Sequence, residues 1–318
     1  MLDARFAGRT AADVLGFGAD VPVFATLADA LSGAPQTPEA LLIGIAPQGG
    51  GLPPEWRDVL LAAIEAGLAI WSGLHTFLGD DPEISAAAAG AGVELRDLRR
   101  PPSGLPVASG LAAGSRAFRV LTVGTDCNVG KMTACLEIRR ALEAKGIPAD
   151  FAATGQTGIL LEGRGIAVDA VVSDFVAGAA ERLVLDAAPE ADVLLIEGQG
   201  SLLHPGYSPV MLGLLHGALP QRLILCWMPA RTHIYGGQHD WVAIPPLDHV
   251  VALYEEAMTW ACPPEPCRVL GLAANTFGLP EDEARREVER AGEVTGLPST
   301  DPIRFGAEAL AEAIARAS

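Results

Sequence analysis

Apolar positions along the first hundred residues fall into short runs, and longer segments with apolar residues at helical spacing separate these runs. Runs of this length are typical of buried strands, and the segments 56–66 and 82–91 predict crossover helices on an open sheet. Together they indicate a small Rossmann-like unit. The predicted strands are residues 21–25, 41–46, 68–71 and 93–95.

The same alternation resumes beyond residue 117, with stronger apolar runs. Gly146 and Pro148 follow the first helical segment of this half and together indicate the end of a helix. The predicted strands are residues 120–123, 149–153, 193–196, 223–227 and 269–274, and the predicted helices are residues 133–145, 281–291 and 307–315.

A stretch rich in proline, glycine and serine, residues 100–114, separates the two halves and is typical of a domain boundary. We therefore predict an α/β protein with a Rossmann-like domain at residues 1–110. A doubly wound, mainly parallel sheet with a phosphate loop is expected to fill residues 111–318. The loops that follow parallel strands share one edge of the sheet, so ligand-binding groups are expected on those loops.

Composition narrows the class of protein. The chain has 318 residues, half of them hydrophobic, and 22 basic against 39 acidic residues give a net charge of −17. Such an acidic chain predicts no nucleic-acid partner. No leader pattern and no run of eighteen apolar residues occur, and the five cysteines are scattered without a common zinc spacing, so we expect no membrane partner and assign no metal. A cytoplasmic homo-oligomer that acts on a small molecule is expected.

The segment GTDCNVGKMT, residues 124–133, follows an apolar strand and precedes a helix. A glycine-rich turn in that position directs backbone N–H groups and the positive end of the helix toward an anion, and a lysine adds charge. The match to the Walker A pattern is imperfect: five residues separate the two glycines, methionine stands where a magnesium-binding hydroxyl is usual, and a threonine follows one position late. We predict a phosphate site formed by Gly124, Thr125, Asn128, Val129, Gly130, Lys131, Met132 and Thr133.

Two further loops follow strands of the same sheet, TGQTG at 154–158 and EGQGSLLHP at 197–205. Glu197 is placed to bind magnesium or to accept a proton, and Asp126 could be its companion. His204 could be a base, a hydrogen-bond donor or an ordinary loop residue. The predicted substrate-binding residues of these loops are Thr154, Gln156, Thr157, Gln199 and Ser201.

Three single residues complete the predicted site. Arg231 lies in the tract 227–241, which follows another strand, and could bind a substrate carboxylate. Asn275 comes just after the strand at 269–274, where a side-chain amide could bind a purine ring. His75 follows a strand of the first domain and is a candidate for substrate binding, whereas Asp80 and Asp81 are expected to cap the next helix.

The motifs resemble known families. GTDCNVGKMT together with EGQGSL is similar to the phosphate loop and second acidic loop of dethiobiotin synthetase and its ATP-dependent relatives, in which the loop aspartate and the strand-end glutamate help to bind magnesium. The wider set adds APQGG, SGLHTFLGDDPE, DLRRP, TGQTG, EGQGSLLHP and NTFG, and resembles the DgcN family over nearly the full chain. That resemblance implies a Rossmann-like domain, a P-loop domain and D-glutamate N-acetyltransferase activity with acetyl-CoA.

These observations lead to a mechanistic hypothesis. Acetyl-CoA binds with its phosphates on residues 124–133, and the amine of D-glutamate attacks the thioester directly. Glu197 is the first candidate for the general base, and Asp126 and His204 are the second candidates. Gln199 or backbone N–H groups stabilise the oxyanion. The alternatives are an ATP- and magnesium-dependent ligase or kinase acting on a carboxylate, and a nucleotide-dependent switch or chaperone. Met132 favours the transferase, because a magnesium ligand is lost there.

Overall fold

The computed structural model describes residues 1–45, 47, 50–261 and 265–318. The chain divides into two compact units, Met1–Arg100 and Pro101–Ser318, where the sequence predicted domains at 1–110 and 111–318. Ala46, at the end of one predicted strand, and Cys262 lie outside the described residues.

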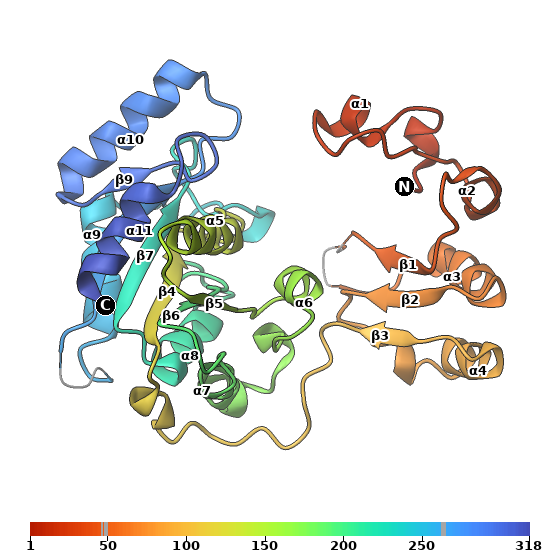
Figure 1. Ribbon diagram of the computed structural model, residues 1–318, viewed down its shortest axis with the longest axis horizontal. Coiled ribbons are helices and arrows are strands. Elements are labelled where there is room, and N and C mark those ends of the chain that lie inside the picture. The colour runs from red at the N-terminus through yellow and green to blue at the C-terminus, as the bar shows by residue number, and fades with distance from the viewer. Residues whose placement is uncertain (46, 48–49, 262–264) are drawn as a thin grey trace. The chain divides into compact units, whose positions relative to one another are not determined.

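The first unit is built on a parallel three-stranded sheet in the order β1-β2-β3 (Figure 1). Leucine and isoleucine side chains from the strands and from α3 and α4 form its core. The elements are β1 (Ala40–Ile43), β2 (Ala69–Ser72), β3 (Leu95–Asp97), α1 (Ala11–Leu15), α2 (Leu27–Gly33), α3 (Arg57–Glu65) and α4 (Pro82–Ala91).

The predicted strand at 21–25 is wrong. This segment makes only isolated bridges, in which Phe24 pairs with Leu2 and Pro22 with Thr10. Pro22 has no N–H to donate to a sheet, and Thr26 caps α2 directly afterwards, so no room remains for a strand.

The helix cap predicted near residue 80 is confirmed for Asp81. Its carboxylate accepts hydrogen bonds from the backbone N–H groups of Glu83 and Ile84, both at 3.1 Å, and Pro82 occupies the first helical position. Asp80 instead pairs with Arg100 at 2.8 Å. Both aspartates therefore have structural partners in the first unit.

The second unit is a six-stranded sheet in the order β5-β6-β4-β7-β8-β9, and every strand pair that the structure describes is parallel. Helices cover the sheet, with α5 packed beside α11 and α7 beside α8 (Figure 1). The strands are β4 (Phe118–Gly124), β5 (Ala149–Ala152), β6 (Val193–Ile196), β7 (Arg222–Trp227), β8 (Arg268–Ala274) and β9 (Ser299–Thr300). The helices are α5 (Lys131–Ala144), α6 (Gln156–Glu162), α7 (Val176–Leu185), α8 (Ser208–Ala218), α9 (Leu247–Ala257), α10 (Glu281–Thr295) and α11 (Glu308–Ala317).

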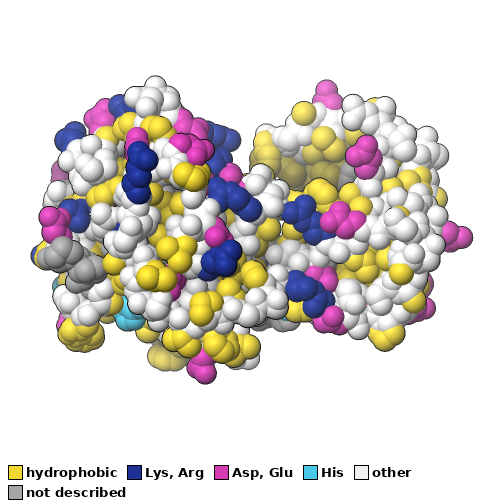
Figure 2. Space-filling view, turned by 60° about the horizontal axis from the view of Figure 1, so that its bottom comes forward, with side chains coloured by type: hydrophobic (Ala, Val, Ile, Leu, Met, Phe, Trp, Pro, Cys, Tyr) yellow, Lys and Arg dark blue, Asp and Glu magenta, His cyan; other side chains and the backbone are white. Residues whose placement is uncertain are grey.

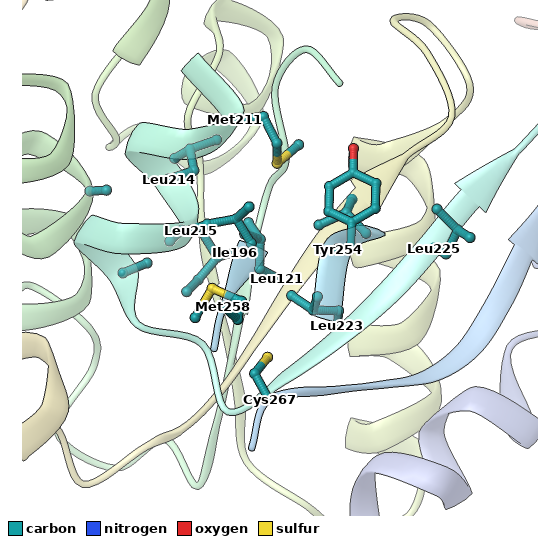
Figure 3. Packing of buried hydrophobic residues seen from close by; sticks show 14 of the residues in the cluster. Leu121, Ile196, Met211, Leu214, Leu215, Leu223, Leu225, Tyr254, Met258 and Cys267 are labelled. Carbon is teal, nitrogen blue, oxygen red and sulfur yellow. The ribbon is translucent and has the colours of Figure 1, made fainter. Parts of the chain in front are cut away.

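Hydrophobic side chains fill the space between this sheet and its helices. Figure 3 shows Leu121, Ile196 and Leu223 of the central strands beside Met211 of α8 and Tyr254 of α9. The central strands are buried along nearly their whole length, which explains why they appear in the sequence as continuous apolar runs rather than alternating ones. The α/β fold predicted from the sequence is confirmed.

The segment before β4 is bound to the second unit. The buried carboxylate of Glu181 on α7 accepts hydrogen bonds from the backbone N–H of Ser109 at 2.9 Å and from its hydroxyl at 3.0 Å. It also accepts one from the N–H of Ala112 at 3.4 Å. Gly178, one turn earlier on α7, lies against the Pro106 carbonyl so closely that a Cβ there would be 1.7 Å from its oxygen.

Close packing of α7 against α8 depends on glycine. A Cβ on Gly217 would lie 2.0 Å from the carbonyl oxygen of Ala177, which is a backbone atom that cannot rotate away. We therefore expect Gly217→Ala to lower the free energy of unfolding by about 1–3 kcal/mol, measured by urea denaturation. Gly292→Ala in α10, where the nearest atom is 3.4 Å from the added Cβ, is the matched control. Equal stability of the two variants would contradict this packing.

The surface has a mixed character. On the face shown in Figure 2, Lys and Arg side chains are interspersed with acidic and hydrophobic ones. Among the described residues, no helix combines the length and the apolar character that crossing a membrane requires.

Candidate functional site

The carboxyl ends of three adjacent strands bring the predicted loops together. β4 leads into the phosphate loop, β6 leads into Glu197, and β5 leads to Thr154. The side-chain hydroxyl of Thr122 on β4 accepts a hydrogen bond from the N–H of Gly198 at 3.0 Å and so attaches the loop after β6 to β4. A Cβ on Gly198 would lie 1.7 Å from the Thr122 carbonyl oxygen, so the close approach requires glycine.

The phosphate loop has the backbone shape of an anion cradle. Asn128 and Gly130 have φ angles of 53° and 99°, and α5 begins directly afterwards at Lys131. Left-handed residues within a turn direct successive N–H groups inward, and the helix start adds its positive end. Val129 is buried beneath the loop, and the backbone N–H of Thr125 bonds to the Cys226 carbonyl at 3.0 Å.

Lys131 lies within this loop. Its Nζ donates a hydrogen bond to the carbonyl of Asp126 at 2.7 Å, and a Cβ on Gly124 would be 3.2 Å from that nitrogen. Burial lowers the pKa of Lys131, and the charges of Cys127, Cys226, Asp126 and Glu197 oppose this effect. A bound anion would also favour the charged form of Lys131 and so oppose the effect of burial on its pKa.

Glu197 is a buried carboxylate at the mouth of the loop. Its Oε2 accepts hydrogen bonds from the backbone N–H groups of Thr154 at 2.9 Å and Gly155 at 3.2 Å. Burial raises the pKa of Glu197 to about 7, although these N–H groups and the charge of Lys131 favour the ionised form. A carboxylate with such a pKa can take up and release a proton near neutral pH.

Asp126 lies in the site, but its oxygens already have donors. Oδ1 accepts from the N–H of Cys127 at 2.6 Å, and Oδ2 accepts from Arg231 at 3.0 Å and from the N–H of Tyr235 at 2.8 Å. The side chain is fully buried. This arrangement suits a holding role between two loops better than the proton transfer or magnesium binding expected from the sequence.

The same contacts change the expectation for Arg231. Its NH1 group bonds to Asp126 and to the carbonyl of Cys127 at 2.6 Å, and its guanidinium lies 5.2 Å from the ring centre of Tyr235. The sequence predicted a clamp for a substrate carboxylate. The structure places NH1 of this arginine against the phosphate loop, as the partner of Asp126, and does not test the predicted substrate contact.

His204 is buried beside the phosphate loop, with only 3% of its surface exposed. Its Nδ1 accepts a hydrogen bond from the N–H of Gly206 at 3.1 Å, so the neutral ring carries its proton on Nε2. Burial also lowers the pKa of His204. Of the roles left open by the sequence, this geometry suits a hydrogen-bond donor.

Ser201 forms a hydrogen bond with the first residue of the phosphate loop. Its hydroxyl donates to the carbonyl of Gly124 at 2.7 Å, and the hydroxyl of Tyr254 donates to the same oxygen at 2.7 Å. Tyr254 also accepts from the N–H of Leu202 at 3.1 Å. Sequence reasoning missed this tyrosine. Its only signal was its helical spacing, four residues after Val250 on the same helix.

The other predicted residues lie around the same edge. Thr154 is fully buried and donates its hydroxyl to the Glu197 carbonyl at 2.9 Å. A Cβ on Gly155 would be 2.2 Å from the amide nitrogen of Gln199, which places that side chain beside the glutamate loop. Gln156, Met132 and Thr133 are partly exposed at helix starts, and Thr157 is exposed.

Asn275 lies on the opposite side of the phosphate loop from Glu197, because β8 and β6 flank the β4–β7 pair. A Cβ on Gly130 would be 3.8 Å from its amide nitrogen. The side-chain oxygen accepts from the N–H of Phe277 at 3.1 Å, which leaves the amide N–H groups for a ligand. Asp301 holds the next residue, Thr276, through two hydrogen bonds, and sequence reasoning missed it as well.

His75 belongs to the first unit. Its backbone N–H donates to the carbonyl of Gly50 at 2.8 Å, and a Cβ on Gly50 would meet its ring at 2.3 Å. The structure therefore gives His75 close contacts within its own unit and does not test the predicted substrate role.

Comparison with known proteins covers both units. Residues 4–101 match the Rossmann-like domain of the DUF1611 family and residues 106–311 match its P-loop domain, each described as a domain of unknown function. A protein from Tritonibacter scottomollicae named D-glutamate N-acetyltransferase is 42% identical over 87% of this chain and 81% of its own length. A protein of the same name from a Pseudoalteromonas species is 38% identical over 86% and 80%.

A solved structure extends the comparison. The crystal structure of a DUF1611 family protein from Anabaena variabilis superimposes with a TM-score of 0.93 and 41% identity, over 99% of this chain and 90% of that one. The family resemblance expected from the motifs is thereby confirmed. This chain belongs to the DUF1611 family, with its N-terminal Rossmann-like domain and its C-terminal P-loop domain.

Proposed function

We propose that the protein is a D-glutamate N-acetyltransferase that transfers the acetyl group of acetyl-CoA to the amine of D-glutamate. Two relatives at 38% and 42% identity carry that name. The observation that carries the proposal is Glu197, a buried carboxylate with a pKa of about 7 at the mouth of an anion-binding loop. The site therefore has both a proton acceptor and a binding loop for a phosphorylated cosubstrate.

The loop fits coenzyme A by the chemistry of its donors. The N–H groups of residues 128–130 and the ammonium of Lys131 would hold the diphosphate, while Asn275 on one side would contact the adenine. Because Glu197 and Thr154 lie on the other side, the thioester end would extend toward them. The acetyl thioester supplies the electrophile.

The donor set fits magnesium less well. Met132 offers no hydroxyl, and both oxygens of Asp126 already accept hydrogen bonds from protein groups, including one from the Arg231 guanidinium. A cation beside that guanidinium would meet a like charge. We therefore favour a coenzyme held by hydrogen bonds over a magnesium nucleotide.

The proposed chemistry needs one proton acceptor. The ionised Glu197 takes a proton from the D-glutamate ammonium, and the free amine attacks the acetyl carbonyl carbon. A C–N bond forms and the C–S bond breaks as the thiolate leaves. The second proton of the nitrogen passes to solvent, and the protonated Glu197 can return its proton to the thiolate.

A single assay tests the proposal. Purified protein is incubated with acetyl-CoA and D-glutamate without ATP, and free thiol is followed against a matched reaction with L-glutamate. We expect thiol release that depends on D-glutamate and yields N-acetyl-D-glutamate by mass spectrometry. No thiol release, together with ADP formation when ATP and magnesium are supplied, would overturn the proposal in favour of a ligase or kinase.

Lys131 allows a test of the coenzyme site. The chain has two lysines, Lys131 in the loop and Lys145 on the surface, so Lys145→Met is a matched control for Lys131→Met. A charged hydrogen bond contributes about 1.5–3 kcal/mol, so we expect the KM for acetyl-CoA to rise roughly 10- to 100-fold in Lys131→Met. An unchanged KM would place the phosphates elsewhere.

A further inference from the structure

We propose that His204 and His239 together bind the side-chain carboxylate of the amino-acid substrate, so that this pair selects an acidic amino acid. The inference rests on the proposed function, because it identifies which groups of the same site hold D-glutamate. It also replaces Arg231, whose guanidinium is paired with Asp126.

The two imidazoles come from distant segments and meet beside the phosphate loop. Their ring centres are 4.9 Å apart with the planes at 75°, and the ring of Tyr207 lies 4.5 Å from that of His204. Gly206 lies next to both rings, because a Cβ there would be in ordinary contact with them, 3.5 Å from His204 Nδ1 and 3.5 Å from His239 Nε2. His204 is buried and His239 is half-exposed, so the pair runs from the interior to the surface.

The protonation of His204 makes it a donor. Since its Nδ1 accepts the Gly206 N–H, the neutral ring presents an N–H at Nε2. Burial favours this neutral form by lowering the pKa of His204. A ring held in this way can donate to a carboxylate without first gaining a proton.

The neighbouring charges favour an anion at this position. Atoms of Asp126, Cys127 and His204 that could ligate a metal lie within 4.8 Å of one another. However, Nε2 of neutral His204 has no lone pair to offer, and the Asp126 carboxylate is neutralised by Arg231. Asp126 acts on His204 as a negative charge, and the smaller effect of Lys131 opposes it. The cations Arg231 and Lys131 therefore offset the carboxylate of Asp126 at this position.

A hairpin-like arm, residues 232–244, holds His239 in place. The N–H of Ile234 bonds to the Val242 carbonyl and the N–H of Ile244 bonds to the Thr232 carbonyl, both at 2.9 Å. Directly after these pairs, the N–H of Tyr235 bonds to Asp126 in the phosphate loop. The arm thus joins a fixed attachment at the phosphate loop to the contact between His239 and His204.

The test separates substrate binding from coenzyme binding. Kinetics with D-glutamate and with acetyl-CoA are compared for His239→Gln and His204→Gln, and His233→Gln serves as the control because it is an exposed histidine on the same arm. We expect the KM for D-glutamate to rise at least tenfold in both cluster variants, with the KM for acetyl-CoA within threefold of wild type. We also expect kcat/KM to fall more for D-glutamate than for uncharged D-glutamine.

The outcomes separate the two proposals. Circular dichroism and thermal melting first establish that each variant is folded, and His239→Gln, at a partly exposed position, keeps the test open if the buried His204→Gln fails to fold. A D-glutamate KM that stays within twofold of wild type in folded His239→Gln overturns the histidine site alone. Wild-type protein that releases no thiol with D-glutamate overturns the proposed function itself.

Discussion

Replacing Glu197 by glutamine is expected to lower kcat for acetyl transfer about 100- to 1,000-fold, while the dissociation constant of acetyl-CoA stays within threefold of wild type. A positioned general base contributes roughly 10²- to 10⁴-fold to a rate. Glutamine keeps one oxygen that can accept the N–H groups of Thr154 and Gly155, so the loop geometry is retained and only the proton acceptor is lost. Stopped-flow thiol release and calorimetric titration of acetyl-CoA measure the two quantities.

The pH dependence of the wild-type enzyme provides an independent check on this carboxylate. Burial raises the pKa of Glu197 to about 7, so the side chain is protonated and inactive as a base below that pH. We expect kcat/KM for D-glutamate to rise through pH 7, and this limb to vanish in Glu197→Gln. Glu190→Gln, at an exposed position, controls for the loss of a negative charge. Full turnover in Glu197→Gln would assign the base to another group.

Removing the carboxylate of Asp126 is expected to cause the largest loss of stability. Asp126→Ala leaves the guanidinium of Arg231 and the N–H groups of Cys127 and Tyr235 without their acceptor. Breaking one partner of a buried ion pair costs about 3–5 kcal/mol, because the remaining charge stays in a poorly solvated place. Urea denaturation followed by circular dichroism measures the loss.

The double variant distinguishes an ion pair from simple packing. In Asp126→Ala with Arg231→Ala no charge is stranded, so we expect the double variant to be more stable than Asp126→Ala alone. If the two single losses simply add, the pair has no energetic coupling and the holding role assigned to Asp126 is wrong.

The strands β4 to β8 of the second unit could be predicted from the sequence because they are buried on both faces, whereas the helices α6 to α9 were not predicted. Five continuous apolar runs marked β4 to β8, and the glycine-rich loop marked the point where ligands bind. The short edge strand β9 gave no such signal, since two residues carry no periodicity. At 21–25 an apolar run was mistaken for a strand, because Pro22 outweighed the hydrophobic pattern.

The site was harder to predict than the fold because its contacts join distant residues. Motifs placed Glu197, Lys131 and Thr154 at one edge, since each follows a strand. Asp126 and Arg231 are 105 residues apart in the sequence, and Tyr254 and Gly124 are 130 residues apart. A local sequence pattern cannot predict contacts at such separations. Two groups that were each expected to meet a ligand therefore turned out to meet one another.

The attachment of the linker to α7 determines where the chain can be cut and rejoined. A protein that began after residue 112 would bury the Glu181 carboxylate without the donors of Ser109 and Ala112, and would leave a hole where the Pro106 backbone lies against Gly178. Because of these hydrogen bonds and this backbone contact, the segment from residue 106 onward belongs to the P-loop unit. Exchange of N-terminal units between relatives is therefore best made before that residue.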